Sequence, residues 1–454
     1  MQLSKSRLLH DTLRRYVRRQ AWSHLDRLVE KTRMEELAAA MATMSERDQL
    51  TIFERVPEPA DKALLICAMQ PPFGKHVLDP MPPPDAAAIL KEMARDDMAD
   101  IIADLEPEQA ARVLEILEES EEVEELMQYR DDTAGGIMLP EFVAVSTDMS
   151  AEEALIALRE SGDDVEMVYY IYVVNEHGLL VGVLSLRKLV VAPAQRRIRD
   201  IMEADVISVT SDTDQEEVAR LVSEYDLLAI PVVDDANKLL GIVTVDDVID
   251  VLKEEAEEDF LKMGGVGGTS FEGDASIRRH VRIRFPWLLA SAVSGLLAAA
   301  IMGSFNDTLN AHQFLAFFLP IILGMSGNVG TQSATVTVRG IAMGYIRHGE
   351  RSTEIVRKEI VIGVLMGLMY GLIVGVVATV FGESLYYGVT IGLSMVAGMV
   401  LASTVGTLVP ILLDKLSVDP AVATGPFVTT TIDIVGVFIY FATASLLAGA
   451  FGVV

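Results

Sequence analysis

The stretch Val145-Ser-Thr-Asp-Met-Ser-Ala-Glu-Glu is repeated 64 residues later as Val209-Thr-Ser-Asp-Thr-Asp-Gln-Glu-Glu in this chain of 454 residues. A second match follows, because Gly182-Val-Leu-Ser-Leu corresponds to Gly241-Ile-Val-Thr-Val at an offset of 59 residues. Between residues 136 and 258, short β-type runs alternate with helical patterns. Each copy therefore predicts a strand, a helix, two strands and a second helix, so this α/β region is an internal duplication.

The duplicated unit resembles the CBS domain, whose tandem copies are expected to pack as one regulatory module. We assign the module to residues 132–258, with the copies at about 137–200 and 201–258. The difference between the two offsets indicates five extra residues in the first copy, which we place near Gly162 to Glu166.

CBS pairs often bind adenine nucleotides through a Gly-x-x-Thr/Ser-x-x-Asp pattern. The second copy has this pattern at Gly241, Thr244 and Asp247, where a hydroxyl suits phosphate and a carboxylate suits ribose hydroxyls. The first copy has Ser185, but Lys188 replaces the carboxylate. Thr244 and Asp247 are therefore our hypothesis for an ATP site in one copy.

The segment before the module, residues 21–131, has a helical pattern interrupted by prolines. Apolar residues recur at helical spacing from Ala86 and again from Ala110, 24 residues later, which predicts a small all-α solenoid. We expect this N domain to be a scaffold. Residues 1–20 are basic but lack the apolar core of a signal peptide, which predicts a solvated, partly helical tail.

Charge divides the chain into two parts. Residues 1–284 hold 31 Lys and Arg against 58 Asp and Glu, whereas the remainder holds 6 against 8. An acidic surface attracts cations and repels nucleic acid, so we expect no nucleic-acid partner. Solubility alone is the competing explanation for the acidic part.

The nearly neutral part, residues 285–454, has the apolar runs of about 20 residues that a membrane-spanning helix needs. We therefore predict a domain of five transmembrane helices and a lipid bilayer as its surroundings. The predicted spans are Phe285 to Gly303, Gln313 to Met343, Ile360 to Gly382, Leu385 to Leu413, and Ala421 to Gly449.

Basic residues alternate between the loops that join these spans. They precede the first span at residues 278–284, are missing at 306–311, return at 347–358, are missing again, and reappear as Lys415. The positive-inside rule then places the N-terminus in the cytosol and the C-terminus outside a bacterial inner membrane. Because five spans lack internal symmetry, we expect a homodimer to provide a two-fold axis.

Two spans contain residues that interrupt helices. The second has the run Gly324-Met-Ser-Gly-Asn-Val-Gly after Pro320, and the fifth has Gly425-Pro426, which would free the Val422 carbonyl. Backbone freed at membrane depth is tolerated where it is buried or lines a wet cavity. We expect both interruptions along an ion path, with simple helix kinks as the alternative.

Asp433 is the acidic residue that lies deep in a predicted span, roughly 20 Å from Pro420 if the segment is helical. A carboxylate at that depth indicates a transport pathway or a proton relay. The alternative is a structural hydrogen bond to the hydroxyls of Thr429 to Thr431. Mg2+ prefers oxygen ligands and keeps its water, and no span has a His or Cys cluster; Mn2+ and Co2+ also fit.

Three motifs show that the chain resembles the MgtE family of magnesium channels. They are Gly327-Asn-Val-Gly-Thr-Gln-Ser-Ala-Thr, Asp419-Pro-Ala followed by Pro426 and Asp433, and Val245-Asp-Asp-Val-Ile-Asp-Val-Leu-Lys-Glu-Glu-Ala-Glu-Glu-Asp. The resemblance implies a homodimer with its pore on the dimer axis. It also implies that Asp433 holds hydrated Mg2+ near the Thr429 carbonyl, and we add Asn328 of the first motif to this pore site.

The resemblance further implies a connecting or plug helix, which we place with a glycine-rich linker at residues 259–284. Cytosolic Mg2+ would bridge carboxylates that otherwise repel one another, compact the sensor and close the pore. A solvated surface carboxylate is the alternative for each ligand. The preferred sensor ligands are Asp96, Asp100, Glu216, Asp226, Asp247, Asp250, Glu255, Glu258 and Asp259.

Three other functions compete with a gated Mg2+ channel. One is an ion-coupled carrier of Mg2+, Mn2+ or Co2+ that adenine nucleotide regulates, since a single intramembrane acid serves either mechanism. Another is an enzyme with a membrane anchor, although no nucleophile–base pair, metal triad or phosphate loop supports it. The last is a CBS signalling protein, which would not need polar breaks in its spans.

Overall fold

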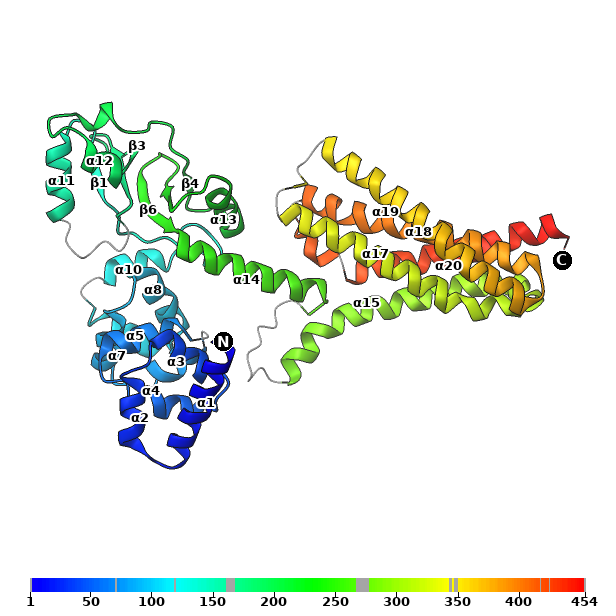
Figure 1. Ribbon diagram of the computed structural model, residues 1–454, viewed down its shortest axis with the longest axis horizontal. Coiled ribbons are helices and arrows are strands. Elements are labelled where there is room, and N and C mark those ends of the chain that lie inside the picture. Colours follow the sequence, from blue (N-terminus) through cyan, green and yellow to red (C-terminus); the bar gives the residue numbers. More distant parts are fainter. Residues whose placement is uncertain are drawn as a thin grey trace. The chain divides into compact units, whose positions relative to one another are not determined.

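The computed structural model describes residues 2–69, 72–117, 120–160, 168–266, 277–342, 345–346, 350–416, 418–423 and 425–452. The chain divides into two compact units, residues 1–252 and 253–454, and each is described by itself. Figure 1 colours the chain from blue at the N-terminus to red at the C-terminus.

The first unit begins with short helices whose lengths are set by prolines and capping residues. They are α1 (Gln2–Arg18), α2 (Trp22–Val29), α3 (Met34–Met41), α4 (Glu46–Phe53), α5 (Pro59–Cys67), α6 (Pro72–Leu78), α7 (Pro83–Leu90), α8 (Arg95–Asp104), α9 (Pro107–Leu114) and α10 (Ser120–Leu126).

Alternate helices of this series pack on one another, α3 on α5, α5 on α7 and α7 on α9. Pro59, Pro83 and Pro107 stand 24 residues apart, and each begins a helix, where its missing N–H leaves no hydrogen bond unmade. The 24-residue repeat predicted from two copies thus extends to a third. Equivalent apolar residues of the three copies are buried: Leu65, Ile89 and Val113.

The basic segment at residues 1–20 is not a solvated tail, and that prediction is wrong. It forms α1, which packs against α2, α3 and α4. Leu13 is fully buried in the core of the helical domain, and Leu9 and Tyr16 pack against the same core. This spacing puts the three side chains on one face of the helix, with the arginines on the others.

The two CBS copies have the predicted order of elements. The first has β1 (Ala144–Ser146), α11 (Ala151–Glu160), β2 (Tyr170–Val174), β3 (Leu180–Ser185) and α12 (Leu186–Val191); a 3-10 turn, η1 (Ile198–Asp200), follows it. The second has β4 (Val209–Thr210), α13 (Gln215–Glu224), β5 (Ala229–Val233), β6 (Leu239–Thr244) and α14 (Val245–Met263).

Each copy forms a three-stranded sheet in which the first pair of strands is parallel and the second antiparallel. Both sheets have a register shift at equivalent places, before Val174 and before Val233, 59 residues apart. The chain ahead of the first copy pairs with the second, because Leu139 exchanges backbone hydrogen bonds of 2.8 and 2.9 Å with Ile242. The five extra residues predicted near 162–166 lie outside the described residues.

The second unit holds five helices, among the described residues, that are long and apolar enough to cross a membrane. They confirm the five predicted spans, although the first begins at Ile277, eight residues earlier than expected. The elements are α15 (Ile277–Ser304), α16 (Asn306–Ala311), η2 (Gln313–Phe318), α17 (Leu319–Ala342), α18 (Glu350–Gly382), α19 (Leu385–Lys415), η3 (Pro420–Ala423) and α20 (Pro426–Phe451).

Glycines let α18 and α19 approach closely (Figure 1). Gly367, Gly371 and Gly375 recur every fourth residue of α18. A Cβ on Gly371 would lie 2.7 Å from the Gly392 carbonyl oxygen, and one on Gly375 would lie 2.8 Å from a second backbone oxygen of α19. Such small-residue contacts replace hydrophobic burial as the source of helix association in lipid.

Of the two interruptions predicted in the spans, the first is wrong and the second is confirmed. α17 runs as one α-helix through residues 324–330, so no break occurs there. In lipid no water competes for the backbone groups, and a helix therefore tolerates this many glycines. The fifth span is interrupted where predicted, because η3 ends at Ala423 and α20 begins at Pro426 within the apolar segment Pro420–Phe451.

Candidate cation sites

The membrane site is built by the antiparallel pair α17 and α20. A Cβ on Gly330 would overlap the Ile432 side chain, and Leu323 lies 3.2 Å from the position a Cβ would take on Gly436. These two contacts bracket Asn328 on α17 and Asp433 on α20, so the two polar residues lie at about the same level along this helix pair. The Asn328 side chain is exposed and that of Asp433 half-buried.

Asp433 lies seven residues after the start of α20, roughly 10 Å along it. The predicted depth of roughly 20 Å assumed one continuous helix from Pro420, whereas a break separates η3 from α20. Among the described residues, none forms a hydrogen bond or ion pair with the Asp433 carboxylate.

The neighbouring threonines do not hold it, because their hydroxyls donate to carbonyls of their own helix segment: Thr429 to Gly425 at 3.2 Å, and Thr430 and Thr431 to Phe427 at 3.2 and 2.8 Å. The structural alternative for Asp433 is therefore wrong. The Thr429 carbonyl lies within α20, not at a break in the backbone.

A second site lies in the first unit, where the start of α8 faces the start of α14. Burial, together with Asp247 and Asp97, raises the pKa of Asp96 from 3.8 to about 8. Burial is also the main cause that raises the pKa of Asp247 to about 6. The pKa of Asp97 is raised by burial and by Asp250. Carboxylates of the helical domain thus lie near carboxylates of the second CBS copy. A cation between them would reduce their repulsion.

The other predicted sensor ligands of the first unit are more scattered. Asp100 is exposed one turn after Asp96, and Glu216 lies in the first turn of α13. Asp226 follows that helix with a φ of 51°, a left-handed conformation. Among the residues that the structure describes, no three His, Cys, Asp or Glu side chains are placed to hold one metal ion.

The end of α14 carries a second acidic group. Burial and Asp419 raise the pKa of Asp259 to about 6, with Glu255 and Glu258 adding to the effect. Lys262 joins this acidic group to the loop before α20. Its Nζ lies 2.7 Å from Glu258 of the group and 2.7 Å from Asp419 of the loop. Burial alone would lower the pKa of Lys262, but its hydrogen bonds to the two carboxylates raise it.

Thr244 and Asp247 lie at the junction of β6 and α14. The Thr244 hydroxyl, which is buried, donates to the Asp247 carboxylate. A Thr followed three residues later by an acid also caps a helix N-terminus, so this pair stabilises α14 with or without a nucleotide.

Three residues of these sites were not among the predicted ligands: Asp97, Lys262 and Asp419. The spacing of Glu258 and Lys262 is a readable i,i+4 signal. The contact of Lys262 with Asp419 has no local signal, because the two residues are more than 150 positions apart.

Five helices able to cross a membrane, a carboxylate within them that has no partner among the described residues, and an attached CBS pair indicate a membrane transport protein. Residues 319–443 match the MgtE family model, described as a divalent cation transporter, and residues 26–132 match the MgtE intracellular N domain. Residues 134–194 and 198–254 match the CBS domain. The chain belongs to the MgtE family of magnesium transporters, which confirms the resemblance seen in the motifs.

The relatives cover most of the chain. The magnesium transporter MgtE of Thermus thermophilus is 42% identical over 334 residues, 72% of this chain and 73% of the relative. That of Enterococcus faecalis is 38% identical over 332 residues, 72% of each chain. Among solved structures, the cytosolic domain of the Mg2+ channel MgtE in complex with ATP is 38% identical with a TM-score of 0.50, and the match covers 53% of this chain and 99% of that one.

Proposed function

We propose that the protein is a Mg2+ channel that admits hydrated Mg2+ into the cytosol and that cytosolic Mg2+ closes. The observation that carries the proposal is the Asp433 carboxylate, which has no partner among the described residues inside the span and is level with Asn328. A carboxylate without a counter-charge in lipid raises the free energy of the folded protein. A cation that passes it offsets part of that free energy.

The pore chemistry follows from the ligands at this level. Mg2+ loses its water reluctantly and is bound by few protein oxygens, so one carboxylate with amide and carbonyl oxygens suits a hydrated ion. A single acid per chain also binds weakly enough for the ion to leave. Two chains, related by the two-fold axis of a homodimer, would place two copies of Asp433 around one path.

Closure by cytosolic Mg2+ rests on the acidic contact between α8 and α14. Asp96 and Asp247 repel each other when both are ionised, and Mg2+ between them would favour the compact arrangement. The same ion would act on Asp97 and Asp250. Asp100, Glu216, Asp226, Glu255, Glu258 and Asp259 complete the proposed sensor.

α14 connects the sensor to the membrane part of the chain. It begins in the second CBS copy and ends at Met263, so a shift at its start moves its far end as well. That far end is attached within the second unit by Lys262 to Asp419, in the loop that precedes α20. Asp433 lies on α20, so this ion pair links the end of α14 to the segment that leads to Asp433.

Further parts of the proposal concern nucleotide and orientation. The ATP complex of the related cytosolic domain supports ATP binding at Thr244 and Asp247. Bacterial relatives and five apolar helices support an inner-membrane location, and the loop charges support a cytosolic N-terminus and an external C-terminus.

The decisive experiment measures Mg2+ flux into proteoliposomes that contain the wild type or Asp433→Ala. Asp307→Ala, an exposed acid on α16, is the matched control. We expect flux without a counter-ion gradient, closure by Mg2+ on the sensor side, and loss of Mg2+ preference only in Asp433→Ala. Slow flux that needs a sodium or proton gradient and ignores sensor-side Mg2+ would replace the channel with an ion-coupled carrier.

A further inference from the structure

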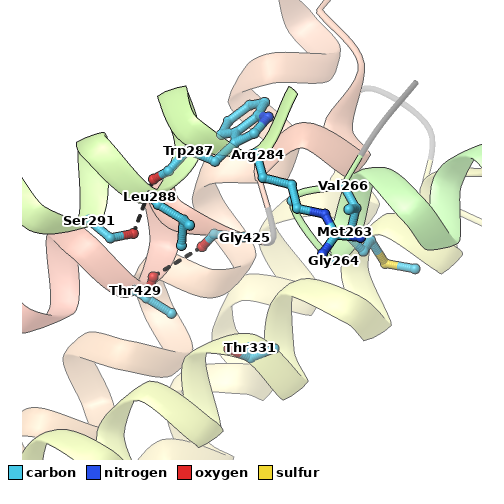
Figure 2. A pocket seen from close by; sticks show the side chains of 11 residues that line it. Met263, Gly264, Val266, Arg284, Trp287, Leu288, Ser291, Thr331, Gly425 and Thr429 are labelled. Atoms are coloured by element: carbon cyan, nitrogen blue, oxygen red, sulfur yellow. Dashed lines mark hydrogen bonds between the residues drawn. The ribbon is translucent and has the colours of Figure 1, made fainter. Parts of the chain in front are cut away.

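A cavity of about 560 Å3 lies in the second unit, where the end of α14, the cytosolic half of α15 and the start of α20 meet (Figure 2). Arg284, Trp287 and Leu288 of α15 line one side, and Met263 and Val266 line the other. Thr331 of α17 and Thr429 of α20 line the remainder, and Thr429 lies one helical turn before Asp433.

Arg284 gives the cavity its charge. It is the charged residue of the lining, and Figure 2 shows its side chain extending toward Met263, Gly264 and Val266. No residue in the described part of the chain forms an ion pair or hydrogen bond with its guanidinium. A guanidinium presents a planar set of donors that fits a phosphate or carboxylate, so the lining is complementary to an anion.

The rest of the lining is mostly apolar or internally satisfied. Ser291 and Thr429 donate their hydroxyls to their own helix segments, to the Trp287 and Gly425 carbonyls, at 3.3 and 3.2 Å. Trp287 packs edge-on against Phe427 with ring centroids 6.3 Å apart, which fixes the indole at the cavity wall. The ligand must therefore join one anionic group to an apolar part.

The position of the cavity along α15 indicates where this ligand comes from. Arginines occupy the helix from Arg278 to Arg284, and apolar residues follow from Phe285. Leu288 is 67% exposed and Leu296 is 72% exposed, so the helix presents an uncovered apolar face beyond the cavity. A change from arginine to apolar residues, with a tryptophan at the change, is typical of the level of lipid phosphates on the cytosolic side.

We propose that this cavity binds an anionic phospholipid of the cytosolic leaflet. Arg284 contacts the phosphodiester, and the glycerol end of the acyl chains lies against Trp287 and Leu288. The bound lipid touches the end of α14, the start of α20 and α15 together, so the lipid composition of the membrane affects the segment that leads to Asp433. The binding itself does not depend on which ion the protein transports.

Trp287 provides a direct measurement, because the chain has two tryptophans, Trp22 and Trp287. Trp22→Phe removes the other one from the full-length protein. This variant is reconstituted in bilayers that contain brominated phosphatidylglycerol or brominated phosphatidylcholine, whose bromines quench a neighbouring indole. We expect Trp287 to be quenched at about fivefold lower mole fraction of the anionic lipid, the preference that one arginine near the surface gives.

Two variants in the Trp22→Phe background test the role of the cavity. Arg284→Gln is expected to remove the preference for the anionic lipid, and Arg284→Lys to retain part of it. Arg282→Gln is the matched control, because Arg282 lies on the same exposed stretch of α15 but not in the cavity lining. If Arg282→Gln weakens the preference as much as Arg284→Gln, general surface charge explains it and the proposal is wrong.

Two further outcomes would also overturn the proposal. Equal quenching by the two lipids in the Trp22→Phe protein would show that the cavity has no preference for an anionic headgroup. Abolition of the preference by millimolar inorganic phosphate would assign Arg284 to a free anion instead of a lipid. Circular dichroism and elution volume of each variant establish that it has folded before quenching is measured.

Discussion

Asp433 and Asp96 are both acids held in unfavourable surroundings, but their neighbours differ. Asp433 is alone in a span of α20, with no partner among the described residues. Asp96 is crowded by Asp97 and Asp247, and its pKa is raised to about 8. A lone carboxylate attracts a passing cation and releases it, whereas opposed carboxylates gain most from a cation that stays. In the proposed function, the first arrangement suits conduction and the second suits sensing.

The largest expected effect tests the lone carboxylate. Asp433→Asn should reduce Mg2+ flux by more than about tenfold, because the charge that offsets entry into the membrane is lost. Asn328→Ala should reduce it less, since an amide contributes a dipole and no charge. Flux is measured in proteoliposomes with a Mg2+-sensitive dye. Equal losses in the two variants would show that the charge of Asp433 has no special role in conduction.

The next effect concerns the opposed carboxylates. At pH 9, above the raised pKa of Asp96, Asp96→Asn removes the repulsion between α8 and α14, so the unit of residues 1–252 should resist trypsin without Mg2+ about fivefold better than wild type, the factor that ~1 kcal/mol of like-charge repulsion gives. Added Mg2+ should then protect less than it does in wild type. Asp235→Asn, in the exposed turn between β5 and β6, is the control and should behave as wild type.

A smaller effect is a pH dependence of the same contact. The pKa of Asp96 is raised from 3.8 to about 8 and that of Asp247 to about 6, so the folded unit binds more protons than the unfolded chain. Without Mg2+, the contribution of these two groups to the free energy of unfolding should therefore be largest below about pH 4. It should fall as the pH rises toward 8. Between about pH 6 and 8, where Asp96 is the one of the two groups that titrates, linkage gives the slope an upper limit of about tenfold in the unfolding equilibrium constant per pH unit, measured by denaturant titration. Asp96→Asn should flatten it, and an unchanged slope would contradict this assignment.

The smallest effect concerns Lys262, whose Nζ forms ion pairs with Glu258 and Asp419. Because both ion pairs are partly solvated, Lys262→Gln should cost about 1 kcal/mol or less. It should increase amide exchange at the end of α14 and leave α18 unchanged. Lys415→Gln, an exposed lysine at the end of α19, serves as control. Exchange that rises equally in both variants would show that Lys262 does not hold this helix end.

Some errors of the sequence prediction have clear physical reasons. The glycines of α17 predicted a break, but their missing side chains allow Ile432 of α20 to approach Gly330, and the helix continues. The basic residues of α1 predicted a tail, but Leu13 anchors that helix in the core. In both cases packing against neighbouring helices, and not the local composition, determines the structure of the segment.

The sequence by itself determined the duplicated α/β unit, the 24-residue helical repeat, the five spans and the lone Asp433, because periodicity and hydropathy are local properties of the chain. Only the tertiary structure decided that Asp96 faces Asp247, that Lys262 contacts Asp419, and that Arg284 opens into a cavity beside Thr429. These pairings join segments far apart in the chain. Local patterns encode which face of an element is buried, but not which other element covers it.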